Sequence, residues 1–254
     1  MNYTVFYDDD YVSVSPYAVK EGGDAYDAFV GYGYYVASQA AAGVISNDEI
    51  GTESVDTVNA FYVPAKNSFM VCHGICSSFI DDSNLSKETL YGLLGITIGH
   101  EISHGFDSTG SLYDKDGTKQ EWWSPKDRES FNEKVDKLTH FYDTKLRCFN
   151  DVPNNGKNVS GEVIADMGGV RVMTNLAEKE PGFDFDKFYS SYSSAFGFTF
   201  AEWIARNVVA NEAHPLPHLR LNVTLAQFER FRKTYDIKPT DGMYIAPEDV
   251  VAIW

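Results

Sequence analysis

Apolar positions recur at helical spacing along most of the chain, whereas one short region has the composition of paired strands. In residues 24–43 apolar side chains recur at the spacing of one helix face, which predicts a helix. Asp24 can cap its start. β-Branched and aromatic residues fill 57–63 and again 68–71, with Pro64 and a turn between them. This pattern predicts a β-hairpin, which should pack beside helices because an isolated hairpin is only marginally stable in water.

A longer apolar run predicts a buried helix that begins near Asn84 or Ser86 and ends near Phe106. Its apolar residues cover more than one face: Leu90, Leu93, Leu94, Thr97 and Ile98. A cap and a first-turn proline at Ser124-Pro125 start another helix, which runs to about Leu146. Its apolar face comprises Phe131, Val135, Leu138 and Tyr142. We interpret this second helix as scaffold.

The remaining sequence predicts further helices. Residues 149–161 are rich in Asn, Gly and Pro and predict a loop, after which Gly168 and Gly169 would let another helix approach closely. Helices are expected through 183–211, with packing residues Phe188, Tyr189, Tyr192, Phe196, Phe200, Trp203 and Ile204. A capping box at Thr224 predicts a further helix that contains Phe228, Phe231 and Tyr235. The pattern as a whole predicts a mainly α fold with a small β-hairpin or sheet.

Composition narrows the functional classes. The chain has 254 residues, 43% of them hydrophobic, which is enough for one large domain or two small ones. A formal net charge of -16 argues against a nucleic-acid partner, because phosphate binding needs clustered Lys and Arg. Residues 1–60 hold ten acidic side chains and a single base, Lys20. A solvated acidic surface is the usual explanation for such an excess.

Location and redox setting follow from what the sequence lacks. No apolar run is long enough for a membrane span, and the first residues do not have the basic and apolar regions of a signal peptide. The three cysteines are too few for a disulfide framework, and Cys72-His73 with Cys76 lacks the second pair that a zinc finger needs. We therefore expect reduced thiols and a cytoplasmic protein.

The chemistry-bearing stretch is His100-Glu101-Ile102-Ser103-His104, inside the apolar helix. Residues four apart share a helix face, so both histidines can direct a ring nitrogen at one metal ion. Glu101 would stand beside water held by that ion, as in zinc metallopeptidases with the pattern His-Glu-x-x-His. The alternatives are a helix with two surface histidines and a helical protein without a metal.

A catalytic zinc usually takes three protein ligands, so a third must come from elsewhere. The metzincin spacing would place it at Gly110, which has no side chain to bind a metal. Thermolysin-like spacing suggests Glu121, but Pro125 stands four residues later and the segment leads into a new helix. Glu162 and Asp166 share a helix face and form the better pair. The alternative for this pair is two exposed acids on an amphipathic helix.

These motifs resemble the neprilysin family of zinc metallopeptidases and its bacterial oligopeptidase O relatives. The sequence from His100 to Asp107 is followed by Trp122-Trp123 and then by the stretch from Glu162 to Gly169, in the family's order and spacing. Further matches are Val58 to Tyr62, His214 six residues before Arg220, and the ending Ile253-Trp254. The resemblance runs from about residue 57 to the C-terminus. It implies a zincin-like, thermolysin-like catalytic domain at 57–254, preceded by an acidic N-terminal remnant with a helix at 1–56.

The resemblance also implies roles for individual residues. One Zn²⁺ would be bound by His100, His104 and Glu162, with Glu101 as general base. Asp107 and Asp166 would hydrogen-bond the two histidines without binding the metal themselves. Asn59 and Ala60 would bind the backbone of a peptide substrate, His214 would stabilise the oxyanion, and Arg220 would anchor the substrate carbonyl side.

The chain departs from the family pattern at several positions. Val163 stands where the family usually has Asn, Glu212 where it usually has Asp, and Cys72 to Cys76 replace the usual Pro-Ala-Gly. These changes concern the substrate subsites rather than the metal. Almost all of the family's long N-terminal portion is absent, so a separate chain that supplies this portion is a candidate partner. We therefore expect a zinc-dependent endopeptidase or oligopeptidase for short peptides; the alternative is a truncated, non-catalytic zinc-binding remnant.

Overall fold

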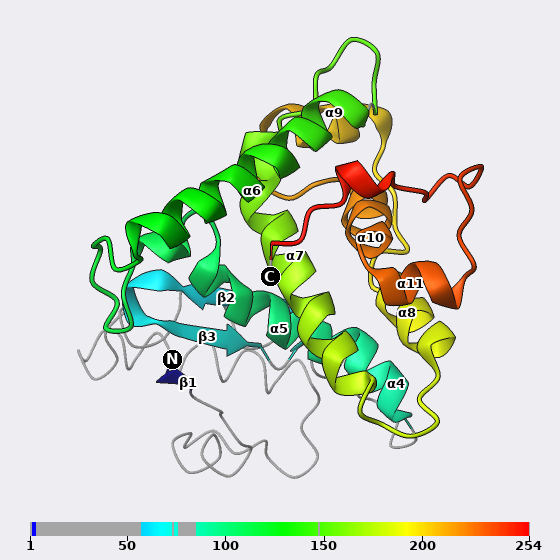
Figure 1. Cartoon of the computed structure of the whole chain (residues 1–254), viewed down its shortest axis with the longest axis horizontal. Coiled ribbons are helices and arrows are strands. Elements are labelled where there is room, and N and C mark those ends of the chain that lie inside the picture. The colour runs from blue at the N-terminus through cyan, green and yellow to red at the C-terminus, as the bar shows by residue number, and fades with distance from the viewer. Residues whose placement is uncertain (1, 4–56, 73, 76–84, 147, 254) are drawn as a thin grey trace, which may run out of the picture.

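The computed structural model describes residues 2–3, 57–72, 74–75, 85–146 and 148–253 (Figure 1). The predicted helix at 24–43 and nearly all of the predicted N-terminal remnant at 1–56 lie outside these residues. The described part is mainly helical, with a small sheet beside the helix that carries the two histidines. Among the described helices, none is long and apolar enough to cross a membrane.

The predicted hairpin is confirmed. Strands β2, Ala60–Val63, and β3, Ser68–Val71, pair antiparallel, so that Ala60 lies opposite Val71 and Val63 lies opposite Ser68. A 3-10 turn, Pro64–Lys66, joins them and ends at Asn67, whose φ of 43° is left-handed. Strand β1, Asn2–Tyr3, pairs parallel to β3 on its other side and was not predicted. The described sheet therefore has the order β1-β3-β2 and leaves β2 at its edge.

The helix with the histidines begins at its predicted cap. The Ser86 hydroxyl accepts from the Thr89 N–H, and helix α4, Lys87–Leu90, follows. A π turn, Tyr91–Gly95, leads into α5, Ile96–Ser103, and a 3-10 turn, His104–Phe106, ends the run. The predicted bounds are confirmed, with Ser86 rather than Asn84 as the start.

Helix α6, Pro125–Lys145, also begins as predicted, because the Ser124 hydroxyl accepts from the Asp127 N–H at 3.2 Å. Phe131, Leu138 and Tyr142 on its predicted apolar face are buried. This face packs against α7, Gly156–Ala177. Helix α6 therefore forms one flank of the molecule (Figure 1).

The predicted loop at 149–161 is wrong from residue 156 onward, because α7 already begins at Gly156. The Asn155 side chain caps the helix by accepting from the Asn158 N–H, and the Gly156 N–H donates to the Asp143 carboxylate on α6. A Cβ on Gly156 would lie 2.5 Å from the Thr139 carbonyl oxygen. The Asn and Gly residues thus mark a cap and a close helix contact rather than a loop.

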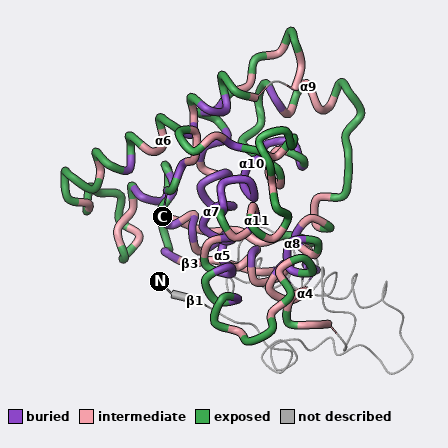
Figure 2. Tube along the Cα trace, turned by 45° about the vertical axis from the view of Figure 1, so that its right-hand side comes forward, coloured by how far each residue is buried: buried purple, intermediate pink, exposed green. Residues whose placement is uncertain are grey.

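Helix α7 is the core of the fold and crosses α5 at very short range (Figure 2). Val163, Ile164 and Val170 on α7 are completely buried. A Cβ on Gly169 would lie 2.5 Å from the Ile96 carbonyl oxygen, and one on Gly99 would lie 2.8 Å from the Gly169 Cα. The predicted close approach at the glycine pair is confirmed. This close crossing of the two helices places Glu162 and Asp166 of α7 beside the histidines of α5.

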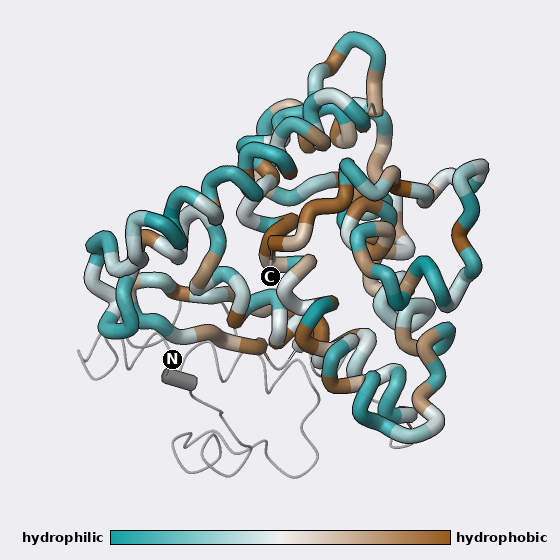
Figure 3. Tube along the Cα trace, in the orientation of Figure 1, coloured by the Kyte–Doolittle hydropathy of each residue, from teal (hydrophilic) through white to brown (hydrophobic). Residues whose placement is uncertain are grey.

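Four helices follow α7 in the described part of the chain. They are α8 Phe185–Ser194, α9 Glu202–Asn211, α10 Pro217–Ala226 and α11 Glu229–Thr234. Of these, α10 packs against α7 and α8 packs against α4. The chain then returns to the centre, where Val251 and Ile253 are buried against the core (Figure 3). This apolar ending is held by hydrogen bonds from Lys134 to the Ile253 carbonyl and from the Val251 N–H to Gln227.

Two predictions for this region are wrong. The helices expected at 183–211 are present as α8 and α9, but Trp203 is 74% exposed instead of packed, because α9 buries only Val209. The capping box fails because Pro217 starts α10 earlier, so that Thr224 is fully buried inside this helix. The last helix instead begins after Phe228, which makes no side-chain cap. The helix start at Pro217 thus overrides the capping signal at Thr224.

Candidate metallopeptidase site

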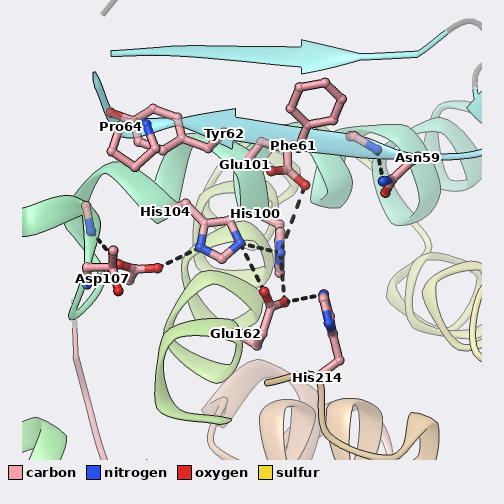
Figure 4. A pocket seen from close by; sticks show the side chains of 13 residues that line it. Asn59, Phe61, Tyr62, Pro64, His100, Glu101, His104, Asp107, Glu162 and His214 are labelled. Carbon is pink, nitrogen blue, oxygen red and sulfur yellow. Dashed lines mark hydrogen bonds and ion pairs between the residues drawn. The ribbon is translucent and has the colours of Figure 1, made fainter. Parts of the chain in front are cut away.

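His100 and His104 meet at the end of α5 (Figure 4). Their Nε2 atoms lie 2.9 Å apart, and their side chains are only 9% and 16% exposed. The four-residue spacing and the helical geometry account for this juxtaposition. The alternative of two surface histidines is therefore wrong.

A carboxylate holds the other ring nitrogen of each histidine. Asp166 Oδ1 lies 2.8 Å from His100 Nδ1, and Asp107 Oδ2 lies 2.7 Å from His104 Nδ1. Carboxylates accept hydrogen bonds, so this network assigns the proton of each neutral ring to Nδ1. Both Nε2 lone pairs then face each other at 2.9 Å. Such an arrangement requires positive charge between them.

Glu162 of α7 completes the group. One of its carboxylate oxygens lies 3.4 Å from His100 Nε2, and the other lies 3.6 Å from His104 Nε2. The buried Oε2 has no hydrogen-bond partner among the described residues. Nitrogen and oxygen ligands at zinc-like distances from one tetrahedral ion would be about 3.3 Å apart. The three side chains therefore fit one divalent metal ion.

Glu101 lies next to this group. Its carboxylate is 4.0 Å from His100 Nε2, and its side chain is 7% exposed. His100, Glu101 and His104 together offer ligand atoms within 4.8 Å of one another. Glu162 contacts both histidines at shorter range than Glu101 contacts one, so Glu162 is the better third ligand. Glu101 is left free for proton transfer.

The electrostatics of the group favour positive charge. Burial alone would lower the pKa of His100, but the hydrogen bond to Asp166 and the negative charge of nearby Glu162 outweigh it and raise this pKa to about 9. Burial opposes ionisation of Glu162, yet the neighbouring His100 lowers the pKa of this carboxyl below its ordinary value. A proton or a metal ion is thus stabilised at the same place. In contrast, burial raises the pKa of Glu101, as suits a group that must take up a proton.

Arg220 binds the carboxylate that holds His100. Its Nε and Nη2 atoms donate to the two oxygens of Asp166 at 2.9 and 2.6 Å. The guanidinium stacks 5.0 Å from the Phe196 ring, and Nη2 lies 3.6 Å from Glu162. The arginine lowers the pKa of Asp166 against the opposing effect of burial. Asp166 is therefore ionised when it accepts from His100.

His214 reaches the site from the loop between α9 and α10. Its Nε2 lies 3.3 Å from Glu162 Oε2, while its side chain is 64% exposed. The ring points toward Glu162 across the open side of the site (Figure 4). An N–H on this ring could donate to a substrate atom bound at the mouth. Prolines at 215 and 217 limit the freedom of the adjoining backbone.

One cleft of about 330 Å³ is lined by His100, Glu101, His104, Asp107, Glu162 and His214. His100, His104 and Glu162, here called the metal group, form its floor together with Glu101. Strand β2 and Asn59 form one wall (Figure 4). Asn59 Oδ1 accepts from the N–H of Ala60, so the side chain is held at the strand end. Arg220 lines an adjoining cavity with Phe196 and Phe198, and His214 borders both spaces.

The structure also resolves the competing ligand candidates. Glu121 binds Arg128 at 3.0 Å on the surface, with 53% of its side chain exposed, and does not line the cleft. Cys72 is buried at the end of the hairpin, whereas His73 and Cys76 lie outside the described residues. Glu162 and Asp166 are not the exposed acids of the alternative interpretation, since their side chains are 13% and 2% exposed.

Sequence reasoning missed some lining residues. Tyr62 and Pro64 form part of the β2 wall, and Thr109 follows the histidine helix into the cleft. Strand alternation places Tyr62 on the same side as Ala60, so the hairpin pattern could have indicated it. Phe196 was assigned to packing alone. Its contact with Arg220 depends on the tertiary fold, and no local signal predicts it.

Comparison with known proteins agrees with this geometry. The chain is 32% identical to a neutral endopeptidase of Lactococcus lactis over 197 residues, which are 78% of this chain and 31% of the relative. It is 30% identical to neprilysin-3 of Drosophila melanogaster over 217 residues, with 78% of this chain and 26% of the relative covered. The chain thus spans about a third or less of the length of these curated relatives.

Solved structures show the same fold. The crystal structure of PepO from Lactobacillus rhamnosis matches with a TM-score of 0.76 and 30% identity, over 83% of this chain and 33% of that one. A Mycobacterium tuberculosis zinc metalloprotease in complex with an inhibitor matches with a TM-score of 0.77 and 23% identity, over 91% and 37%. The sequence model of peptidase family M13 matches residues 59–251 of this chain. With the site geometry above, this match shows that the chain belongs to peptidase family M13.

Proposed function

We propose that this chain is the catalytic portion of a zinc-dependent endopeptidase that hydrolyses short peptides. The observation that carries the proposal is the convergence of His100, His104 and Glu162. Their ligand atoms lie 2.9 to 3.6 Å apart at the floor of a cleft, with Glu101 adjacent. Two imidazoles and a carboxylate form a donor set typical of catalytic zinc. Zinc held there would supply Lewis-acid activation of water and of a peptide carbonyl.

Glu101 is the proposed general base. It would accept a proton from the attacking water and deliver this proton to the amine nitrogen that leaves when the peptide bond breaks. Its buried position favours uptake of this proton, because burial raises its pKa. His214 would donate a hydrogen bond to the carbonyl oxygen as negative charge develops there.

Asp107 and Asp166 are proposed to fix the orientation and tautomer of the histidines. Each accepts from Nδ1 and so presents the Nε2 lone pair to the metal. Asp107 is itself held by the backbone N–H groups of Thr109 and Gly110. Asp166 is held by Arg220. Neither carboxylate can turn away without losing several hydrogen bonds.

The peptide backbone is proposed to lie along β2, with Asn59 and Ala60 as its partners. Strand β2 is an edge of the described sheet, and an edge strand can pair with an extended peptide. Arg220 uses two of its five N–H groups on Asp166. The other N–H groups could anchor a substrate carbonyl beyond the cleaved bond.

A non-catalytic remnant is the second candidate, because the chain covers only 31% of the first relative. The two are separated by assaying the purified chain with a short fluorogenic peptide, with and without a chelator, and by measuring its zinc content. The proposed function requires bound zinc and chelator-sensitive cleavage. Bound zinc without cleavage would support the remnant, and cleavage that ignores the chelator would contradict both.

A further inference from the structure

The hairpin loop carries a buried side chain that the proposed mechanism does not use. Asn67 ends the 3-10 turn between β2 and β3 in a left-handed conformation, with φ 43° and ψ 50°. It is only 8% exposed, although it lies at the tip of a hairpin. Asparagine tolerates this conformation better than most residues, but its burial requires partners for the amide group.

Both ends of the Asn67 amide are engaged. Its Oδ1 accepts from the Tyr62 hydroxyl at 2.9 Å, and its Nδ2 donates to the Lys115 carbonyl at 2.9 Å. Tyr62 belongs to β2 and lines the cleft, whereas Lys115 lies 48 residues further along the chain. One side chain thus ties the strand at the cleft to a distant turn.

That turn packs directly on the hairpin loop. Gly117 has a φ of 77°, and a Cβ there would lie 2.1 Å from the Ala65 carbonyl oxygen. The Asp114 carboxylate accepts from the Asp116 and Thr118 N–H groups, which keeps the turn rigid. The backbone of the hairpin loop therefore contacts a preorganised turn.

The same segment also holds a histidine of the site. Before the turn, the Thr109 and Gly110 N–H groups donate to Asp107, and Asp107 binds His104 Nδ1. Residues 107–117 thus contact the metal group at one end and the hairpin at the other. Figure 4 shows β2 along one side of the site, with Tyr62 and Pro64 toward one end and Asn59 toward the other.

We propose that Asn67, with Tyr62 and the Lys115 carbonyl, is a clamp that positions β2 above the histidines for pairing with a peptide backbone. Asn67 is a positioning residue and does not touch the substrate. The inference rests on the proposed function, since the substrate is the peptide of that reaction. The clamp itself is a property of the free protein and can be tested without activity.

Two variants remove one hydrogen bond each. Asn67→Asp keeps the size, the backbone preference and the acceptor for Tyr62, but it loses the donor to Lys115. Tyr62→Phe keeps the ring and loses the hydroxyl. Asn154→Asp is the matched control, because Asn154 donates in the same way to the Tyr142 and Leu146 carbonyls, away from the hairpin.

The first readout is peptide hydrolysis by the 254-residue chain with zinc bound. Pairing with β2 is present in the ground state and in the transition state alike, so loss of the clamp should raise KM about tenfold with little change in kcat. Zinc content should stay at the wild-type level, and Asn154→Asp should leave KM unchanged. Wild-type KM in both clamp variants would overturn the proposal.

The second readout is hydrogen exchange, which does not depend on activity. The clamp predicts faster exchange of the amides of 60–71 in both variants, by about tenfold, with α7 unaffected. Equal exchange in wild type and variants, or a uniform increase over the whole chain, would overturn the proposal. If the wild-type chain cleaves no peptide, the proposed function fails, while this measurement still decides on the clamp.

Discussion

Arg220 donates two hydrogen bonds to Asp166, which is buried behind His100. Through this contact a residue of α10 helps to fix the ring orientation of His100, the proposed metal ligand on α5. Three helices therefore contribute to the position of one imidazole nitrogen. The geometry of the site depends on how α5, α7 and α10 pack.

Replacing the carboxylate tests this dependence. Asp166→Asn should lower zinc affinity by about 10- to 100-fold, because the amide cannot hold the Nδ1 proton of His100 in the same way. It should also destabilise the protein by about 1 to 3 kcal/mol, since Arg220 would lose its charged hydrogen-bond partner Asp166 and keep only the contact with Glu162 at 3.6 Å. Zinc titration and urea unfolding measure the two effects. Wild-type affinity in the variant would contradict the role of Asp166.

The helix crossing at Gly169 is a second test. Gly169→Ala would place a methyl group 2.5 Å from the Ile96 carbonyl oxygen, so α5 and α7 must separate. We expect a loss of about 1 to 3 kcal/mol in stability and weaker zinc binding, as Glu162 moves away from the histidines. Gly242→Ala is the control, because no described atom lies within 4 Å of its Cβ position. Equal zinc affinity in the Gly169 variant would disprove the coupling.

Metal removal should also reduce stability. Zinc bound to the folded chain and not to the unfolded chain stabilises the fold by mass action. A chelator should lower the Tm, and added zinc should restore it. His104→Ala should have a low Tm that responds to neither reagent. An identical Tm with and without chelator in the wild-type chain would argue against the metal site.

Stability should fall at alkaline pH. Burial raises the pKa of Tyr189 from 10.0 to about 12, so the folded protein keeps this proton where the unfolded chain releases it. The contribution of this group is therefore complete below pH 10 and is lost as the pH rises to 12, by up to about 2 to 3 kcal/mol. Unfolding by urea at several pH values measures the slope. Tyr189→Phe should lessen it, and an unchanged slope would refute the assignment.

The sequence predicted the elements whose signals are local. The cap at Ser86, the cap at Ser124 and the strand-forming residues on either side of the turn after Pro64 each act within a few residues, and the structure has all three. The spacing of His100 and His104 is likewise a local property of a helix. The glycine pair on α7 correctly indicated a close helix contact.

Errors arose where contacts distant in sequence decide the structure. Gly156 starts a helix because Asp143 and Thr139 of α6 surround it, which no pattern within 149–161 reveals. The error at Thr224 has a local cause instead, because Pro217 at the first helical position starts α10 earlier. Glu162 could be preferred over Glu121 from spacing, but its contacts with both histidines depend on the crossing of α5 and α7.

The most direct test of the central claim is cleavage by the Glu101→Gln variant. Glutamine keeps the shape of the side chain but cannot accept the proton from water. We predict wild-type zinc content and a loss of hydrolysis of about 100-fold or more, the usual contribution of a general base. Glu133→Gln on the exposed face of α6 serves as control and should cleave normally. Full activity of the Glu101→Gln variant would contradict the account.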